Sequence, residues 1–337
     1  MTRELLARCS FPPAGTEVDC AVSGGADSLA LLALAVEAGC VVTVHHVDHG
    51  LRPGSAVEAD RVRVAAERFG AAFRSHAVHV PAGPNLEARA RAARYGALPE
   101  GVLTGHTADD QAETVLLNLV RGAGLDGLAG MAPARRPLRR LRRVETQGLC
   151  VELGLDVFHD PSNDDPAFRR NRVRHELLPL LDDLAQRDVV PVLARQADLL
   201  RDDAAVLAEL AADLLLAAAD DPAAAAAVAA ADTAADPAPG GPTAGEPGPE
   251  GGLLRVEDGG SLDARVLARA PVAVARRAVR AWLRDGGAGG DERHPPDAAT
   301  VARVLDVARG DAVACDVGRG WRAVRSKNRM RLHPPGD

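Results

Sequence analysis

The sequence predicts an α/β fold: a parallel sheet with helices on both faces, followed by a helical extension and a small α+β C-terminal domain. Short apolar runs alternate with helical patterns through the first part of the chain, which is the arrangement that builds strand–helix–strand units. With 337 residues and a hydrophobic content of 47%, the chain is long and apolar enough for about two domains. A segment of Ala, Pro, Gly and Asp separates a second patterned region near the C-terminus.

Four strand–helix pairs are expected in the first part. The predicted strands are residues 18–22, 41–44, 72–80 and 101–104, and the helices after them are residues 29–38, 56–69, 85–98 and 108–121. The last helix has apolar residues at helical spacing and ends at Gly122. This alternation continues long enough to form a complete parallel sheet.

The remainder of the chain is predicted to form a helical region, then an unstructured linker, and then a domain of helices and strands. Between Leu199 and Leu214 the apolar residues recur at spacings of three, four and seven, as in a helix packed along one stripe. Residues 220–252 have too few apolar side chains to offset their ordering entropy. The expected domains are therefore an α/β domain at 1–180, a helical extension at 181–219, a low-complexity linker at 220–252 and a C-terminal domain at 253–337.

The C-terminal domain is expected to contain two helices and a basic strand. One helix covers residues 272–284, and Asp297 caps the other, which Gly310 ends. Residues 324–332 show strand periodicity, which puts four basic side chains on one face: Arg325, Lys327, Arg329 and Arg331. Such a face suits RNA phosphate, and an ordinary solvated face is the alternative.

Composition excludes or disfavours several classes of protein. The five cysteines are widely spaced with no Cys-x-x-Cys pair, which disfavours a zinc site, a dithiol or a cysteine-held iron–sulfur cluster. A net charge of −7 disfavours a chain that coats nucleic acid indiscriminately, although arginines are concentrated between residues 135 and 175. No apolar run is long enough for a membrane span and no signal peptide is evident. A cytoplasmic protein without membrane contact is expected.

A candidate anion-binding loop follows the first strand. Ser23, Gly24, Gly25, Ala26, Asp27 and Ser28 stand where that strand ends and a helix begins. Backbone N–H groups and the positive end of the helix dipole converge there, and the glycines let a phosphate approach the main chain. Neither the Gly-Lys-Ser/Thr phosphate loop nor the Gly-x-Gly-x-x-Gly fingerprint is present at this turn. A purely structural Gly-Gly turn is the alternative.

Three acids after the fourth predicted strand form a second candidate site. Asp109, Asp110 and Glu113 crowd one side of the first turns of a helix. Ligands of parallel sheets bind at the carboxyl ends of the strands, where these acids and the Ser23 loop should meet. Partners for the helix dipole are the structural alternative. The histidines nearby, including His46 and His106, show no metal-ligand spacing and are interpreted as pocket-wall groups.

The motif S-G-G-x-D-S resembles the pyrophosphate-binding loop (PP-loop) of the N-type ATP pyrophosphatases. Five later motifs accompany it, in this order: His46-Val47-Asp48-His49-Gly50-Leu51-Arg52, Gly105-His106-Thr107-Ala108-Asp109-Asp110-Gln111-Ala112-Glu113-Thr114, Arg136-Pro137-Leu138, Asp160-Pro161-Ser162-Asn163 and Arg170-Asn171-Arg172-Val173-Arg174-His175. Together these motifs resemble those of the tRNA(Ile)-lysidine synthetase family. The chain departs from the family at Arg139, where the family usually has Leu, and in the linker, which looks inserted.

The resemblance implies an adenine nucleotide α-hydrolase-like fold that uses ATP and Mg²⁺. Residues 1–180 would be the catalytic domain and residues 253–337 a tRNA-binding domain. Cytosine at the wobble position of an isoleucine tRNA would be adenylylated, and free L-lysine would then displace AMP. Asp27, Asp110 and Glu113 would be catalytic, with Asp27 and Asp110 as Mg²⁺ ligands. The Ser23–Ser28 loop and His46 would bind ATP, and four residues would bind tRNA: Arg170, Asn171, Arg172 and Arg174. The resemblance also allows a homodimer.

Three alternatives stay open beside this interpretation. A tRNA thiolase of the same superfamily would adenylylate in the same way but deliver sulfur, and the missing Cys-x-x-Cys disfavours it. A small-molecule synthetase is disfavoured by the arginine-rich segments. A non-catalytic nucleotide sensor on the same fold would not need Asp110 and Glu113 beside the loop.

Overall fold

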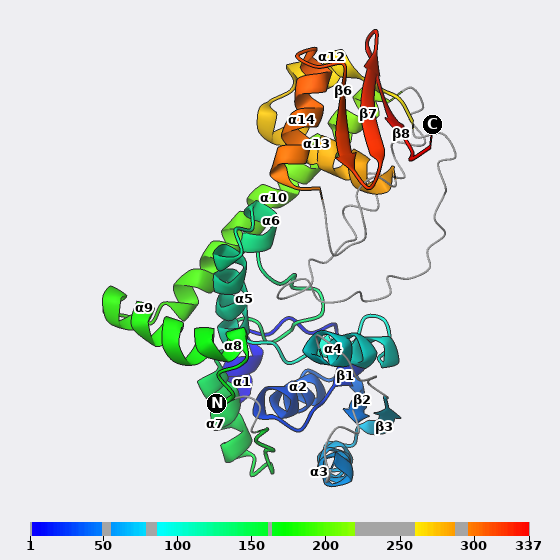
Figure 1. Ribbon diagram of the computed structural model, residues 1–337. Helices are drawn as coiled ribbons and strands as arrows, with labels where there is room; N and C mark the ends of the chain where they lie inside the picture. Colours follow the sequence, from blue (N-terminus) through cyan, green and yellow to red (C-terminus); the bar gives the residue numbers. More distant parts are fainter. Residues whose placement is uncertain are drawn as a thin grey trace. The chain divides into compact units, whose positions relative to one another are not determined.

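The computed structural model describes residues 2–48, 55–78, 86–160, 164–219, 260–286 and 296–336 (Figure 1). These residues form two compact units, and the division between them falls after Arg201, inside helix α10 (Val190–Ala218). The predicted linker at 220–252 lies outside the described residues, so its prediction stays untested. Among the described helices, none is both long and apolar enough to cross a membrane.

The first unit contains a parallel sheet of four strands, as predicted. The strands are β1 (Glu17–Ala21), β2 (Val41–Asp48), β3 (Ala72–Ala77) and β4 (Leu103–Thr104), in the order β3-β2-β1-β4. The predicted limits of three strands were wrong by two residues or more. β2 runs four residues further, so His46 and Asp48 lie within it rather than after it, and β3 and β4 are shorter than expected.

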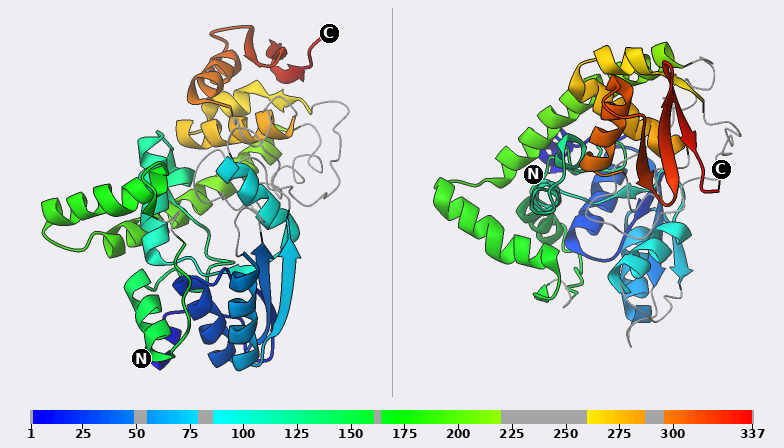
Figure 2. Two further views of the ribbon diagram at one scale, coloured as in Figure 1. Left: turned by 60° about the horizontal axis from the view of Figure 1, so that its bottom comes forward. Right: turned by 45° about the horizontal axis from the view of Figure 1, so that its top comes forward.

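Helices α2 (Ala26–Glu37) and α3 (Ser55–Arg68) pack on one face of this sheet (Figure 2). Four leucines of α2 are almost fully buried: Leu29, Leu31, Leu32 and Leu34. A helix that is apolar around most of its circumference belongs in a core, and here it packs against Cys20, Val42 and Val44 of the sheet. The remaining predicted helices of this part are α4 (Leu86–Ala97) and α5 (Ala108–Val120).

The strand order determines where a ligand can bind. The chain adds β2 and β3 on one side of β1 and then places β4 on the other side. A crevice forms outside the carboxyl ends of strands at such a switch point. The segment after β4 also approaches the start of α2 closely, because a Cβ on Gly105 would lie only 2.5 Å from the carbonyl oxygen of Asp27. Only glycine fits there without a shift of the backbone.

Several further helices of the first unit were not predicted from the sequence. They are α1 (Thr2–Leu6), α6 (Leu125–Leu128), α7 (Arg143–Glu152), and a continuous run of α8 (Arg169–Arg172), the π-helical turn η2 (Val173–Leu177) and α9 (Leu178–Ala185). Helix α10 lies within the range predicted as a helical extension, 181–219, and begins nine residues before Leu199, the first residue of the predicted apolar stripe. Its first turns pack with α5, η2 and α9 around Leu116, Leu178 and Val190.

The second unit has the α+β fold predicted for the C-terminal part of the chain, and it also includes α10 from Asp202 onward. Its antiparallel sheet has the order β5-β8-β7-β6, formed by β5 (Leu262–Asp263), β6 (Ala314–Gly318), β7 (Trp321–Ser326) and β8 (Arg329–His333). It packs against α12 (Ala264–Arg269), α13 (Val272–Asp285), α14 (Ala298–Arg309) and the end of α10. Both predicted helices are confirmed, and Asp297 caps α14 by accepting from the backbone N–H of Thr300 at 2.6 Å.

The single basic strand predicted at residues 324–332 is wrong. These residues form the β7–β8 hairpin, with Lys327 in the turn at a φ of 55°. The turn resets the alternation of the side chains, so Arg325 pairs with Met330 and points to the core side, while Arg329 and Arg331 point away. Arg325 donates to the carbonyl oxygens of Val307 and Ala308 at the end of α14.

Candidate active site

The Ser23–Ser28 loop has the conformation expected of an anion-binding turn. Gly24 adopts a φ of +88°, which favours glycine, and Gly25 is the N-cap residue of α2. Ser28 Oγ donates to the Gly25 carbonyl at 2.8 Å and accepts from the Ser23 N–H at 3.1 Å. The loop is therefore held in shape by its own hydroxyl groups, at the positive end of a 12-residue helix.

Asp27 lies in the first turn of α2, and helix α7 contacts both of its carboxylate oxygens. Thr146 Oγ1 donates to Oδ1, and Arg143 Nε lies 3.4 Å from Oδ2. Burial, together with the negative charge of Asp110, raises the pKa of Asp27 to about 6, although Arg143 and Thr146 oppose this shift. Asp27 is thus a carboxylate with less positive compensation than its burial requires.

Asp110 and Glu113 come from the first two turns of α5. Asp110 Oδ2 accepts hydrogen bonds from the N–H and the Oγ1 of Thr107, at 2.8 and 2.9 Å. Burial alone would raise the pKa of Asp110, but Arg143, Arg170, His106 and the Thr107 N–H hold it far below its usual range. The Glu113 side chain is fully buried. Asp110 and Glu113 lie on one side of the helix, as their spacing predicts, and both contact Arg143 and Arg170.

Three arginines neutralise these acids. Arg143 Nη2 lies 3.0 Å from Asp110 Oδ1, and its Nη1 lies 3.1 Å from Glu113 Oε1. Arg170 Nε donates to Glu113 Oε2 at 2.6 Å, and its Nη2 lies 3.2 Å from Asp110 Oδ1. Arg174 Nε donates to Glu113 Oε1 at 2.7 Å. We call these six residues the acid–arginine cluster: Asp27, Asp110, Glu113, Arg143, Arg170 and Arg174.

Asp109, the third acid of the predicted group, has a different environment. Its Oδ2 accepts from the backbone N–H of Arg143 at 2.7 Å, and both oxygens bind the guanidinium of Arg142 at 3.1 Å. Arg142 also pairs with Asp188. Asp109 therefore caps the start of α7 and fixes the backbone of Arg143. It is not a member of the cluster, but it helps to position the Arg143 side chain.

Sequence reasoning missed α7 and with it Arg143 and Thr146. Arg143, Thr146 and Cys150 lie on one face of this helix, and Cys150 Sγ donates to the carbonyl of Ala26 at 3.3 Å. A usable signal was present: Thr146, Leu149, Cys150 and Leu153 follow helical spacing. In a chain so rich in arginine, however, Arg142 and Arg143 did not stand out.

The histidines interpreted as pocket-wall groups lie at the base of the site. His46 is buried, and its Nδ1 donates to the Val22 carbonyl at 2.9 Å, directly before the loop. Thr104 Oγ1 lies 2.7 Å from Nδ1 of His106. His45 is engaged elsewhere, because its two ring nitrogens contact Asp19 and His76. His49 lies outside the described residues.

The four residues predicted to bind tRNA divide into two groups. Arg170 and Arg174 point inward to Glu113, and Asn171 is buried, with its amide donating to the Asp165 carbonyl at 2.9 Å. Arg172 is exposed and pairs with Glu176 at 2.8 Å. The structure therefore places Arg172 on the surface and directs the other two arginines to the acids, because buried carboxylates require countercharge.

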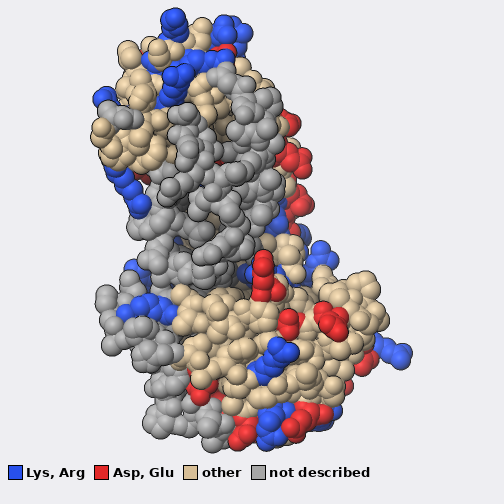
Figure 3. Space-filling view, turned by 90° about the vertical axis from the view of Figure 1, so that its right-hand side faces the viewer, with Lys and Arg blue, Asp and Glu red and all other residues tan. Residues whose placement is uncertain are grey.

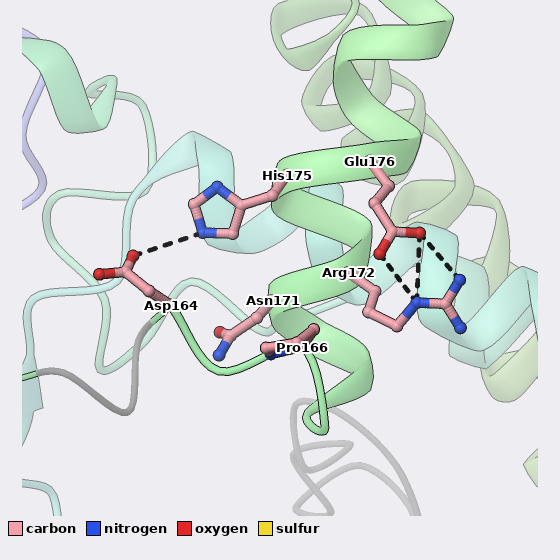
Figure 4. Close-up of a pocket in the computed structure, with 6 residues that line it drawn as sticks. All are labelled: Asp164, Pro166, Asn171, Arg172, His175 and Glu176. Carbon is pink, nitrogen blue, oxygen red and sulfur yellow. Dashed lines mark hydrogen bonds and ion pairs between the residues drawn. The ribbon is translucent and has the colours of Figure 1, made fainter.

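A pocket of about 240 Å³ adjoins Arg172 (Figure 4). Asp164 lies at one side of it, 3.8 Å from His175 Nε2, and the Arg172–Glu176 pair lies at the other. The residues that line it are Asp164, Pro166, Asn171, Arg172, His175 and Glu176. The motif residues Pro161, Ser162 and Asn163 lie outside the described residues. Asp164, which directly follows this motif, and Asn171 of the arginine-rich motif both line the pocket.

Two neighbouring carboxylates of the cluster are suitable ligands for Mg²⁺. Mg²⁺ usually binds one or two carboxylates together with substrate phosphates, and the Asp27 and Asp110 carboxylates are close enough for the charge of one to raise the pKa of the other. Within the described part of the chain, no group of three His, Cys, Asp or Glu side chains is arranged to hold a metal ion. Two carboxylates beside the loop therefore fit a cation shared with bound phosphate.

Comparison with known proteins identifies the family. Residues 4–181 match a family described as PP-loop domain, and residues 262–331 match one described as TilS substrate binding domain. The tRNA(Ile)-lysidine synthase of Nocardia farcinica is 42% identical over 96% of this chain and 92% of its own length. The enzyme of the same name from Rhodococcus erythropolis is 41% identical over 80% of this chain and 74% of its own.

A solved structure resembles the chain more distantly. The U34-tRNA thiolase NcsA from Methanococcus maripaludis is 19% identical, with a TM-score of 0.47 over 59% of this chain and 78% of that chain. The sequence relatives and the two family matches agree with the motifs of the loop and of the cluster. The chain belongs to the tRNA(Ile)-lysidine synthase family.

Proposed function

We propose that this protein ligates lysine to the wobble cytidine of an isoleucine tRNA, with ATP cleaved to AMP and pyrophosphate. The observation that carries the proposal is the meeting of the Ser23–Ser28 loop with Asp27, Asp110 and Glu113 at the carboxyl edge of the sheet, in a chain of this family. The loop suits a polyphosphate, and the acids suit a cation or an amine. We expect the enzyme to act in the cytoplasm.

In the first proposed step, the cytosine carbonyl oxygen attacks the α-phosphate of ATP and pyrophosphate leaves. Ser23, Gly24, Gly25, Ala26 and Ser28 would hold the phosphates through backbone N–H groups and hydroxyls. His46 supports this loop from below through its bond to Val22, so its proposed part in ATP binding is indirect. Donors that face the charge developing on phosphate lower the barrier to reaction.

In the second proposed step, the amine of free L-lysine attacks the ring carbon of the adenylylated cytidine and AMP leaves. Asp110 and Glu113 are proposed to receive and orient this amine. Their carboxylates are buried and fixed by Thr107 and by the arginines. A fixed geometry is what positioning of a nucleophile requires.

Mg²⁺ is proposed as the metal ion of the ATP complex. Asp27 is the residue best suited to hold it, because it lies in the loop and the charge of Asp110 acts on it. Asp110 is a weaker candidate, since Thr107, Arg143 and Arg170 already donate to its oxygens. The ion would supply charge neutralisation at the phosphates.

Recognition of tRNA is proposed to involve two surfaces, one in each unit. Arg172 lies exposed beside the pocket of Figure 4, while Arg170, Asn171 and Arg174 would shape the site from within. In the second unit, the outer face of the sheet carries Arg322, Arg329 and Arg331. Basic side chains are visible on this unit in Figure 3. Phosphate contacts of this kind bind RNA without reading sequence.

The thiolase alternative is supported less well. All five cysteines are free, and burial raises the pKa of each thiol, to about 12 for Cys20 and about 11 for Cys150. A sulfur-transfer site needs accessible thiolates or a cluster ligated by them. The small-molecule synthetase and the nucleotide sensor have no observation in their favour comparable to the family match.

One assay tests the proposal. The protein is incubated with labelled lysine, ATP and total tRNA from a bacterium, and label is measured in RNA. Lysine incorporation that requires ATP, and that disappears when the wobble cytidine is changed to uridine, is expected. Pyrophosphate release with lysine but without RNA would instead favour a small-molecule synthetase, and release with RNA and a sulfur donor but not lysine would favour a thiolase.

A further inference from the structure

The acid–arginine cluster already contains its own cations. Arg143 contacts all three acids: its Nε lies 3.4 Å from Asp27, its Nη2 lies 3.0 Å from Asp110, and its Nη1 lies 3.1 Å from Glu113. Arg170 and Arg174 supply two further guanidinium groups. The formal charges of the three carboxylates and the three guanidiniums cancel. Without bound phosphate, the cluster therefore has no net negative charge to offer a further cation.

This balance creates a difficulty for the second substrate. In the proposed function, on which this inference rests, an ammonium group of lysine must reach Asp110 and Glu113. It would meet three guanidiniums there, and like charges repel strongly in a site where the acids are buried. Lysine is thus not expected to bind well until negative charge is added or positive charge is withdrawn.

ATP supplies that negative charge next to Arg143. The proposed phosphate loop contains Asp27, and Arg143 is the arginine that contacts Asp27. Its side chain is 19% exposed, against 25% for Arg170 and 23% for Arg174, so the contact with Asp27 and not its exposure distinguishes Arg143 from the other two arginines. Arginine binds phosphate in a bidentate geometry that competes well with carboxylate. Arg170 and Arg174 are instead directed to Glu113, on the α5 side of the cluster.

We propose that Arg143 is a charge switch that makes lysine binding depend on ATP. Phosphates bound at the Ser23–Ser28 loop draw the guanidinium of Arg143 away from Asp110 and Glu113, and these carboxylates then accept the lysine ammonium. ATP consequently binds before lysine. Arg143 is a positioning residue for the acids in the resting protein and a phosphate partner in the ATP complex.

The test measures binding, not turnover. Binding of labelled L-lysine to the full chain is determined by equilibrium dialysis, with and without α,β-methylene-ATP and with and without tRNA. The analogue should tighten lysine binding by a factor of about ten or more, given one unit charge withdrawn at this separation. L-Norleucine, which lacks the side-chain ammonium, should not compete. Equal lysine affinity with and without the analogue would overturn the inference and leave the proposed function intact.

Variants test the role of charge. Arg143→Gln removes one positive charge, so its lysine affinity without the analogue should come within about threefold of that with it. Arg143→Lys keeps the charge and should keep the dependence on the analogue. Arg63→Gln is the control, because Arg63 is an exposed partner of Glu67 on α3. Loss of the dependence in Arg143→Lys or in Arg63→Gln would contradict the argument from charge.

Two outcomes remain to be distinguished. If Arg143→Gln does not fold, as judged by thermal unfolding, the wild-type comparison and Arg143→Lys still decide the question. If the wild-type protein binds no lysine under any condition, with ATP analogue and tRNA both present, the proposed function itself fails and the switch fails with it. Lysine affinity that is the same with and without the ATP analogue is a different result, because it contradicts only the charge switch and leaves the proposed function intact.

Discussion

Glu113 shows how strongly a single residue can depend on its partners. Its side chain is fully buried, and its two carboxylate oxygens form ion pairs with the guanidinium groups of Arg143, Arg170 and Arg174. A charge so far from water is stable only because it is paired, and removing one member of a buried pair leaves the others uncompensated. Stability and the proposed chemistry therefore depend on the same carboxylate.

Glu113→Gln should destabilise the fold by about 3–5 kcal/mol, because it leaves three guanidiniums with less countercharge. The matched control is Glu67→Gln, whose carboxylate is 61% exposed and pairs only at the surface, and which should change stability by less than about 1 kcal/mol. Urea unfolding monitored by circular dichroism measures both. Similar small losses in the two variants would mean that the cluster is more hydrated than its burial indicates.

In contrast to Glu113, Asp27 is expected to lower the stability of the fold when it is ionised, although it contributes to the proposed activity. Its pKa in the folded state is raised to about 6, from 3.8, mainly by burial. The folded protein therefore holds this proton up to a higher pH than the unfolded chain does. The resulting stabilisation is complete below the unfolded pKa and is lost as the pH rises through about 6.

Asp27→Asn cannot ionise, so it should be more stable than wild type at pH 7, by on the order of 1–3 kcal/mol. This advantage should disappear as the pH falls from about 6 to below 4. Adenylylation should meanwhile fall by about 10² or more, because a charge-stabilising group is lost. Unfolding curves across this pH range and ATP-dependent pyrophosphate release check the two parts, and full activity in the variant would refute the assignment of Asp27.

Sequence alone predicted the acids better than their partners. The i, i+3 spacing of Asp110 and Glu113 on one helix is a local pattern, and a helix period converts it directly into proximity. Arg143 lies 30 residues beyond Glu113, and its position depends on how α7 packs against the start of α2. No local pattern records such a contact. Arg170 and Arg174 were predicted to bind RNA, because their contacts with Glu113 likewise join distant segments of the chain.

At the scale of elements, the contact between β4 and α2 controls the geometry of the site. Gly105 follows β4, and a Cβ on it would lie 2.5 Å from the carbonyl oxygen of Asp27 and 3.0 Å from the N–H nitrogen of Ser28. Both atoms are backbone atoms of the Ser23–Ser28 turn. A side chain at Gly105 would therefore push the α5 segment and the loop apart.

Gly105→Ala should lower stability by about 1–3 kcal/mol through overpacking, and should lower adenylylation more than a core substitution of equal cost. Gly148→Ala is the control: this glycine lies inside helix α7 with nothing within 4 Å of a new Cβ, and the change should stabilise the fold by about 0.5–1 kcal/mol. Thermal unfolding and pyrophosphate release are measured on both. An active Gly105→Ala would show that the approach is not needed for catalysis.

Most regular elements were predictable, and the failures have physical causes. The strands and helices of residues 18–121 follow periodicities that burial imposes, since each presents an apolar face to one core. The β7–β8 hairpin was read as one strand because Lys327 and Asn328 continue the alternation of basic and other residues through the turn. Lys327 in a left-handed conformation gives no sequence signal comparable to glycine.

At the scale of the whole molecule, α10 belongs to two cores. Val190, near its start, packs with α5 and α9, whereas Ala211, Leu215 and Ala218 pack with the helices and sheet of the second unit. The division between the two units therefore falls inside this helix of 29 residues. Binding at the second unit contributes to catalysis only if that unit contacts the same tRNA.

The outer face of the second sheet is the place to test that contact. Arg322 and Arg331 are exposed on this face, whereas Arg325 points to the other side and holds the end of α14. The hairpin thus offers two arginines that should bind phosphate and one that should not. The distinction comes from the register of β7 and β8, and a single straight strand would have made Arg325 and Arg331 equivalent.

Arg331→Ala should weaken tRNA binding for all sequences and flatten the dependence of log affinity on log salt by about one unit at most, because one phosphate contact releases about one counterion. Arg325→Ala should instead lower thermal stability, since α14 loses a C-terminal cation, and should keep the salt slope. Arg172→Ala tests the first unit in the same titration. Filter binding at several salt concentrations gives the slopes, and an unchanged slope in both Arg331→Ala and Arg172→Ala would place the RNA surface elsewhere.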